Sequence, residues 1–362
     1  MVLTPDVHRA YARIEPKHAE RARRLEESLD TLLALGRDCA SGLLQEIKPA
    51  IAVSPKWKFD YLTKTLESPF ELEPDVAYWC GMLAKLKRLG GLGWFELRDD
   101  GAVAPDVWRR TAHGFDVGWT ETTREERFEV SRQIAQERLD QIAQMVGGVG
   151  YFAGKRILDS GCGPGRYIDL MRRLSPLKIV GMDQGERLVD TLKKRFDGDP
   201  IVEIHQGTCE RLEYPDASFD IVLSNGVLHH MPGDLPSMIK DHARVLKPGG
   251  VMFVMLVGKG GLELKLWEFL RGFLYDVSIE SMLDRLGTKM SPLRLQGIVD
   301  HMYGEYQQTD RVDFEKWCRP LFKQVKRVPS IAGLDVTPEL YADDPYFTAR
   351  FGTGHMRYLC FR

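Results

Sequence analysis

The sequence has few of the features that mark secreted, membrane-spanning and nucleic-acid-binding proteins. Its six cysteines in 362 residues lie far apart, without a C-x-x-C pair or a metal-ligand spacing, which predicts reduced thiols in a cytoplasmic protein and no bound metal. No apolar run approaches the roughly 20 residues of a membrane span, and the N-terminal residues lack the apolar stretch of a secretory signal. The formal net charge is −2 with no block of Lys and Arg, so we expect neither a membrane nor a nucleic-acid partner.

Internal repeats and low-complexity tracts are also absent, and the composition is that of an ordinary globular protein. Hydrophobic residues make up 43% of the chain and charged residues 28%, which is typical of soluble domains. A chain of this length can hold two domains, or one large domain with additions. Local motifs therefore have to indicate the function.

The most informative motif is ILDSGCGPG at 157–165. A short apolar run ends at Asp159, as a buried parallel strand does, and a glycine-rich turn and a helical pattern follow. Glycines let the backbone approach a bound ligand where a side chain would collide. A dinucleotide-binding loop requires a glycine in place of Arg166, so the spacing argues against that class of cofactor. The glycines of the turn are Gly161, Gly163 and Gly165.

Further segments with the pattern of buried strands follow in order. KIVGMD ends at Asp183, about 20 residues beyond the glycine turn, where an acidic residue accepts ribose hydroxyls because a carboxylate offers two acceptor oxygens. VEIHQGT comes next, then FDIVLSNGVLHHM at 219–231 and the helix–turn–strand pattern RVLKPGGVMFVML at 244–256. This alternation of strands and helices predicts a parallel sheet with helices on both faces.

The order of these segments resembles the class I S-adenosylmethionine-dependent methyltransferases, and in particular their type 11/25-like small-molecule branch. The resemblance covers about residues 150–260 and implies an α/β fold, a mostly parallel seven-stranded Rossmann-like sheet with helices on both faces. One departure is Thr208, which stands where that family commonly has an acidic residue near the adenine. The resemblance implies S-adenosylmethionine as the cofactor, bound by Asp159, Gly161, Gly163, Gly165, Asp183, Gln184, Thr208, Cys209 and Asn225.

Two adjacent histidines, His229 and His230, follow the fourth strand, where side chains can face the transferred methyl group. Methyl transfer from a sulfonium is an in-line displacement, for which a protein supplies positioning and a dry site. An oxygen or nitrogen acceptor also loses a proton, and histidine is suited to take it near neutral pH. We favour His230 over His229 as the base. The alternatives are that the pair packs the next helix, or that the acceptor needs no base.

The parts outside the resemblance carry no sharp motif. A helix followed by a hairpin in the N-terminal part is similar to the winged-helix-like domain of small-molecule O-methyltransferases, which serves dimerisation and covers the substrate. An unrelated helical cap is the alternative. We expect a mainly helical N-terminal domain at 1–115, the core at 116–261, a helical lid insertion at 262–320, and strands at 321–362 that complete the sheet, with 323–329 as the partner of the last strand.

Aromatic and polar residues of the lid are the candidates for binding the acceptor. Tyr303, Glu305 and Tyr306 in HMYGEY hold the substrate in one interpretation and only cap the site in the other. Phe115 and Trp119, ahead of the sheet, are similar candidates on weaker grounds. The sequence alone does not orient any of these side chains.

The sequence thus predicts a methyltransferase acting on a small-molecule acceptor by O-, N- or S-methylation, with homodimer formation as a further expectation. The alternatives are an RNA or protein methyltransferase and a non-catalytic scaffold with the same fold. Ser-Asn-Gly-Val at 224–227 stands where many base-methylating enzymes carry an N-P-P-Y-type motif, which disfavours the first alternative. The intact glycine turn and Asp183 disfavour the second.

Overall fold

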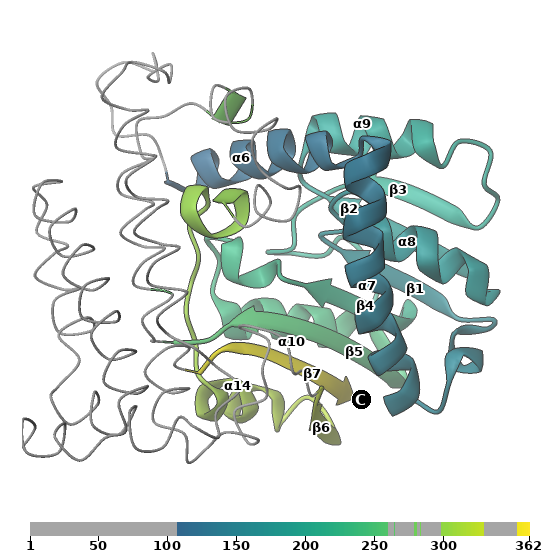
Figure 1. Cartoon of the computed structure of the whole chain (residues 1–362). Helices are drawn as coiled ribbons and strands as arrows, with labels where there is room; N and C mark the ends of the chain where they lie inside the picture. Colours follow the sequence, from purple (N-terminus) through teal and green to yellow (C-terminus); the bar gives the residue numbers. More distant parts are fainter. Residues whose placement is uncertain (1–106, 260–263, 265–278, 281–282, 284–297, 329–352) are drawn as a thin grey trace, which may run out of the picture. The chain divides into compact units, whose positions relative to one another are not determined.

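The computed structural model describes residues 107–259, 264, 279–280, 283, 298–328 and 353–362, and all structural statements refer to these (Figure 1). Apart from Lys259, Leu264, Thr353 and Gly354, they fall in one compact unit. The expected N-terminal domain, except for residues 107–115, lies outside the described residues. The same holds for most of the expected lid before residue 298.

A seven-stranded sheet with the strand order β3-β2-β1-β4-β5-β7-β6 forms the centre of this unit. The strands β1 to β5 pair in parallel, whereas β7 is antiparallel to both of its neighbours, so the sheet is mixed. The predicted pairing of the last strand with the segment around 323–329 is confirmed. The strands are β1 (Arg156–Ser160), β2 (Lys178–Asp183), β3 (Val202–Gln206), β4 (Phe219–Asn225), β5 (Leu246–Val257), β6 (Gln324–Arg327) and β7 (His355–Phe361).

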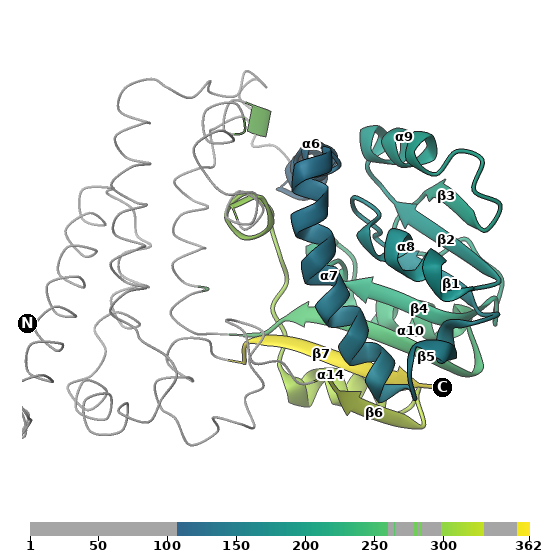
Figure 2. The same ribbon diagram turned by 45° about the vertical axis from the view of Figure 1, so that its right-hand side comes forward.

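Helices cover both faces of the sheet, which explains why the central strands are apolar almost throughout. In β1, Ile157 packs with α7, α8 and α9 on one face, while Leu158 packs with α10 and α14 on the other (Figures 1 and 2). Val222 and Leu223 of β4 divide between the faces in the same way. None of the described helices is long and apolar enough to cross a membrane.

The helices alternate with the strands as the sequence predicts. Asp234 caps the N-terminus of α10 by accepting a hydrogen bond from the Ser237 backbone amide at 3.0 Å, which satisfies one of the free amides of the first turn. The bounds are α6 (Val107–Thr122), α7 (Glu125–Met145), η1 (Val149–Phe152), α8 (Arg166–Met171), η2 (Arg172–Leu174), α9 (Glu186–Arg195), η3 (Leu228–His230), α10 (Leu235–Val245), the π-helical turn η4 (Ile298–Tyr303) and α14 (Arg311–Cys318).

Two glycines of α6 let the turn η4 pack closely against this helix. A Cβ atom on Gly114 would lie 2.6 Å from the ring of Tyr303, and one on Gly118 would lie 2.7 Å from Val299. Such distances are too short for any side chain, so glycine is required for this packing. The contact places η4 beside the part of α6 that carries Phe115 and Trp119.

Gly181 in the middle of β2 offers a test of this packing. A Cβ atom there would lie 2.4 Å from the Cδ1 atom of Ile168 and 3.0 Å from that of Ile204. We expect Gly181→Ala to lower the free energy of unfolding by about 1–3 kcal/mol because it overpacks the core. Gly150→Ala is the matched control, since a Cβ on Gly150 meets nothing within 4 Å. Equal denaturation midpoints for the two variants would contradict the observed close packing of α8 and β3 side chains against Gly181 of β2.

Candidate active site

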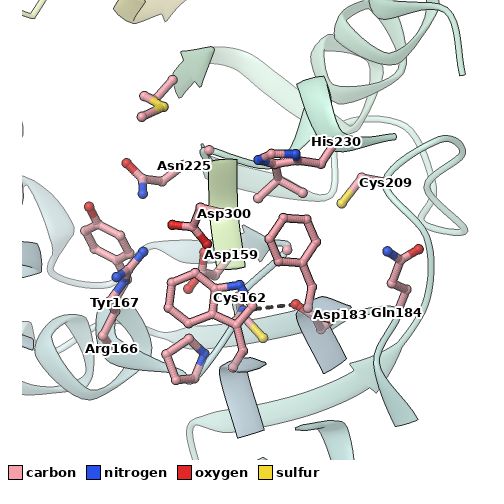
Figure 3. Close-up of a pocket in the computed structure, with 18 of the residues that line it drawn as sticks. Asp159, Cys162, Arg166, Tyr167, Asp183, Gln184, Cys209, Asn225, His230 and Asp300 are labelled. Atoms are coloured by element: carbon pink, nitrogen blue, oxygen red, sulfur yellow. Dashed lines mark hydrogen bonds between the residues drawn. The ribbon is translucent and has the colours of Figure 1, made fainter. Parts of the chain in front are cut away.

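A cavity of about 240 Å³ lies at the carboxyl ends of β1, β2 and β4 (Figure 3). Ligands of open α/β sheets bind at this edge, and residues of α6, α7, η3, η4 and β7 complete the walls. The predicted site residues that line the cavity are Asp159, Gly161, Gly163, Asp183, Gln184, Cys209, Asn225, His229 and His230. Those that do not line it are Gly165, Thr208, Tyr303, Glu305 and Tyr306.

The glycine turn after β1 forms the floor of the cavity. The Gly161 amide donates to the Met182 carbonyl at 2.8 Å, and a Cβ on Gly161 would lie 2.4 Å from Val227, so this glycine is required by packing. Gly163 has a positive φ of 52°, and the nearest atom to a Cβ there would be in the Trp119 ring, 3.9 Å away. The space beside Gly163 is therefore open for a ligand to approach the backbone.

Asp183 holds this turn in place through its carboxylate. One oxygen accepts a hydrogen bond from the Gly163 amide at 3.0 Å and the other accepts one from the Gly185 amide at 3.0 Å. Burial raises the pKa of Asp183, while these backbone hydrogen bonds act to lower it. Each carboxylate oxygen can accept a further hydrogen bond, so the residue can organise the turn and still accept ligand hydroxyls.

Asp159 at the end of β1 is buried in the cavity wall. It is 2% exposed, and its Oδ2 atom has no hydrogen-bond partner among the described residues. Burial raises its pKa to about 7. The positive charge of Arg166 acts to lower this pKa, and the negative charge of Asp183 acts to raise it. The Tyr167 hydroxyl and the Asn225 Oδ1 atom likewise lack a partner in the described part of the chain. Buried polar atoms of this kind fit a polar ligand that would satisfy them.

Arg166, the residue that argues against a dinucleotide loop, does not block the glycine turn. Its guanidinium donates to the Ser131 hydroxyl at 2.9 Å and lies 5.0 Å from the centre of the Trp119 ring. Figure 3 shows the side chain beside Tyr167, at the wall of the cavity. Burial lowers the pKa of this arginine, and its charge lies close enough to act on Asp159.

The loop after β3 contributes one of its two predicted residues to the cavity. The Thr208 hydroxyl accepts a hydrogen bond from the Glu210 amide at 3.2 Å and lies outside the lining. Cys209 lines the cavity, and its thiol contacts the Ser160 hydroxyl at 3.2 Å, which in turn bonds His242 Nε2 at 2.9 Å. Burial lowers the pKa of His242 to about 4 and raises that of Cys209 to about 12. Both groups are therefore neutral near pH 7.

His229 and His230 form the short helix η3, and their ring centres lie 4.2 Å apart. His230 Nδ1 lies 2.7 Å from the Glu305 carbonyl oxygen, which can only accept a hydrogen bond. In the neutral ring Nδ1 therefore carries the hydrogen and Nε2 the lone pair. Phe115 packs edge-on against this ring at 4.6 Å, and the Tyr306 ring lies 6.2 Å away. His230 has the form that a general base requires.

The remaining lid candidates contact protein rather than the cavity. Tyr303 packs against Gly114, and the Arg110 guanidinium lies 4.3 Å above its ring. The Glu305 amide donates to the Thr111 hydroxyl at 2.8 Å. In the structure these residues fasten the end of η4 and the segment after it to α6.

Several lining residues are not suggested by any motif. Arg138 comes from α7, Tyr167 from α8, Asp300 from η4 and His355 from the start of β7. Arg138, Asp300 and His355 reach the cavity only through the packing of distant segments, so no local spacing could have identified them, whereas Tyr167 follows the glycine turn directly. Phe115 and Trp119, the candidates ahead of the sheet, also line the cavity. Among the described residues, no group of three or more His, Cys, Asp or Glu side chains is arranged to hold a metal ion.

Comparison with known proteins connects the site to a family. Residues 158–254 match the family model described as "Methyltransferase domain". The chain is 37% identical over 118 residues to 27-O-demethylrifamycin SV methyltransferase of Amycolatopsis mediterranei (strain S699), covering 31% of this chain and 43% of that protein. It is 33% identical over 109 residues to ubiquinone biosynthesis O-methyltransferase of Mesorhizobium japonicum, covering 30% and 43%. The chain thus spans less than half the length of these curated relatives.

A solved structure with a similar chain is the 1,6-didemethyltoxoflavin-N1-methyltransferase of Burkholderia thailandensis, with bound 1,6-didemethyltoxoflavin and S-adenosylhomocysteine. It has 14% sequence identity and a TM-score of 0.41, and the match covers 74% of this chain and 94% of that one.

The family match and the named relatives confirm the predicted resemblance to the class I S-adenosylmethionine-dependent methyltransferases, within the part of the chain that they cover. That part is residues 158–254, and S-adenosylmethionine is the cofactor of the class that these residues resemble. Of the residues on which the sequence prediction rested, Asp159, Gly161, Gly163 and Asp183 line the cavity.

Proposed function

We propose that this protein transfers a methyl group from S-adenosylmethionine to an oxygen, nitrogen or sulfur atom of a small molecule. The observation that carries the proposal is the cavity in which the open backbone at Gly163, the Asp183 carboxylate and His230 meet. Relatives named as O-methyltransferases of small molecules support this acceptor class.

The residues of the cavity suit S-adenosylmethionine in their chemistry. Asp183 would accept the ribose hydroxyls, while Gln184 and Cys209 line the same end of the cavity. Asp159 and Asn225 offer oxygen acceptors that lack a partner among the described residues. The cofactor supplies a methyl group that is already activated on a positively charged sulfur.

The protein's contribution to the reaction is positioning, exclusion of water and removal of a proton. The side chains of Phe115, Trp119 and Val227 form apolar walls, and a dry site favours a displacement in which charge is neutralised. His230 Nε2, which carries the lone pair of the neutral ring, would take the proton from an oxygen or nitrogen acceptor. His229 lies beside it and also lines the cavity.

Titration calorimetry with the full chain tests the cofactor assignment, and label transfer tests the acceptor class. We expect saturable one-to-one binding of S-adenosylmethionine; no binding at about 1 mM cofactor, equivalent to about −4 kcal/mol, would overturn the proposal. Methyl-labelled cofactor is then incubated with the protein and a cell extract. Label that passes an ultrafiltration membrane, separates from the cofactor by chromatography and is missing from a mixture without the protein supports a small acceptor. Label retained until protease or ribonuclease treatment would show a macromolecular one.

A further inference from the structure

The segment 304–309, which we call the strap, fastens the loop that carries the two histidines. Gln307 makes three hydrogen bonds to this loop. Its backbone amide donates to the His229 carbonyl at 2.6 Å, and its side-chain Nε2 donates to the carbonyls of Met231 at 2.6 Å and Gly233 at 2.8 Å. One residue thus satisfies three carbonyl acceptors around η3.

The strap is also tied at both of its ends. At one end the Glu305 amide donates to the Thr111 hydroxyl of α6 at 2.8 Å. At the other end the Thr309 amide donates to the Val257 carbonyl of β5 at 3.4 Å. Between these ties, the Glu305 carbonyl accepts the hydrogen bond from His230 Nδ1. The position of this carbonyl relative to the ring depends on how firmly the strap and the histidine loop are joined.

We infer that Gln307 is a positioning residue for His230. Because Gln307 joins the strap to the loop, it keeps the Glu305 carbonyl at Nδ1 and so holds the proton on that nitrogen and the lone pair on Nε2. Gln307 does not line the cavity and acts only through the histidine. The inference rests on the proposed function, in which His230 is the base.

The strap lies beyond residues 158–254, the part that matches the methyltransferase family. The histidine therefore comes from the family segment, and the group that sets its tautomer comes from the segment that follows. Gln307 thus makes the base competent only when the segment after η4 is in place against the histidine loop.

The test uses the full chain labelled with ¹⁵N-histidine and long-range ¹H–¹⁵N spectra at pH 8. His230→Gln identifies the His230 signals by their loss. In the parent we expect Nδ1 to show the shift of a protonated nitrogen and Nε2 that of an unprotonated one. In Gln307→Met, which keeps the backbone amide and the side-chain length, the two shifts should move toward each other. Gln136→Met removes one exposed side-chain hydrogen bond, to Asp140 on α7, and is the matched control that should leave them unchanged.

Calorimetry with S-adenosylmethionine separates a failure of the positioning role of Gln307 from a failure of the proposed function. Gln307→Met should bind the cofactor with the affinity of the parent, because the changed side chain does not line the cavity. Unchanged His230 shifts in folded Gln307→Met would overturn the positioning role while leaving the proposed function intact, whereas a parent that binds no cofactor would remove both. If Gln307→Met does not fold, Thr111→Val is the second variant, because it removes the hydrogen bond that holds the Glu305 end of the strap. It should move the His230 shifts in the same direction. Unchanged shifts in Thr111→Val would equally overturn the inference.

Discussion

Asp183→Ala is expected to weaken the binding of S-adenosylmethionine by about 100-fold. The carboxylate accepts charge-assisted hydrogen bonds from the amides of Gly163 and Gly185, both at 3.0 Å. Alanine removes these bonds together with the acceptor for the ribose hydroxyls. A hydrogen bond to a charged group contributes about 1.5–3 kcal/mol, and 1.4 kcal/mol is a tenfold change in affinity. Losing one such ligand bond and part of the order of the turn accounts for about 3 kcal/mol.

Two further variants separate the ligand contact from the organisation of the turn. Asp183→Asn keeps the size and one oxygen acceptor, so its affinity should fall between those of the parent and Asp183→Ala. Asp190→Ala changes an aspartate on the exposed face of α9 and should bind as the parent does. Calorimetry gives the affinities and thermal unfolding checks the fold. If folded Asp183→Ala bound the cofactor within roughly threefold of the parent, Asp183 would have no place in the site.

The strands and the strand-end residues of the site could be predicted because their signals are local. A strand covered on both faces is apolar throughout, and KIVGMD is β2 with the predicted ends. In a parallel sheet the carboxyl ends of neighbouring strands meet at one edge. Asp159, Asp183 and Asn225 therefore come together although up to 66 residues separate them in sequence.

The far walls of the cavity could not be predicted, because they depend on how distant segments pack. Asp300 reaches the cavity only because η4 packs against the glycines of α6, and nothing in the neighbouring sequence indicates this. Tyr303 is the opposite case, because it is a candidate for the site by sequence and lies outside it. An aromatic side chain has a large apolar area that favours burial. Tyr303 is 2% exposed and packs against α6 outside the cavity lining.

Gly165 and Thr208 show a second reason for the difference between motif and structure. A family motif lists positions without saying whether a residue contacts the ligand or supports its neighbours. Gly165 is the N-cap residue of α8, and a Cβ atom there would lie 3.0 Å from Leu192 of α9. The Thr208 hydroxyl bonds the Glu210 amide within its own loop. Neither residue lines the cavity; each one supports the neighbouring segments that do.

Near neutral pH, the affinity for S-adenosylmethionine is expected to rise with pH because of Asp159. Burial raises the pKa of this carboxyl to about 7 in the ligand-free protein. A positively charged cofactor in the same cavity favours the ionised carboxylate, so binding lowers this pKa. Below pH 7 a proton must be released on binding, and affinity should increase about tenfold per pH unit toward pH 7 and level off above it.

Calorimetry across pH in buffers of different ionisation enthalpy measures this proton release directly. S-adenosylhomocysteine lacks the sulfonium charge and should show a weaker pH dependence. Asp159→Asn cannot ionise, so its affinity should be nearly flat with pH and meet that of the parent at low pH. Asp169→Asn is the control, because Asp169 is a buried aspartate that pairs with Arg172 at 3.0 Å and does not line the cavity. It should keep the pH dependence of the parent.

The stability of the ligand-free protein provides an independent check on the same carboxyl. Between about pH 4 and pH 7 the unfolded chain has lost the Asp159 proton while the folded protein retains it, so stability falls as the pH rises through this window. The stability that the protonated Asp159 carboxyl gives the folded protein, relative to the ionised form, is fully lost above the folded pKa of about 7. At pH 8, Asp159→Asn should therefore be more stable than the parent, by at most about 4 kcal/mol for a shift of about three pKa units. If the variant instead unfolded at lower denaturant at every pH, Asp159 would be a partnered structural carboxylate, and its assignment to the cofactor would fail.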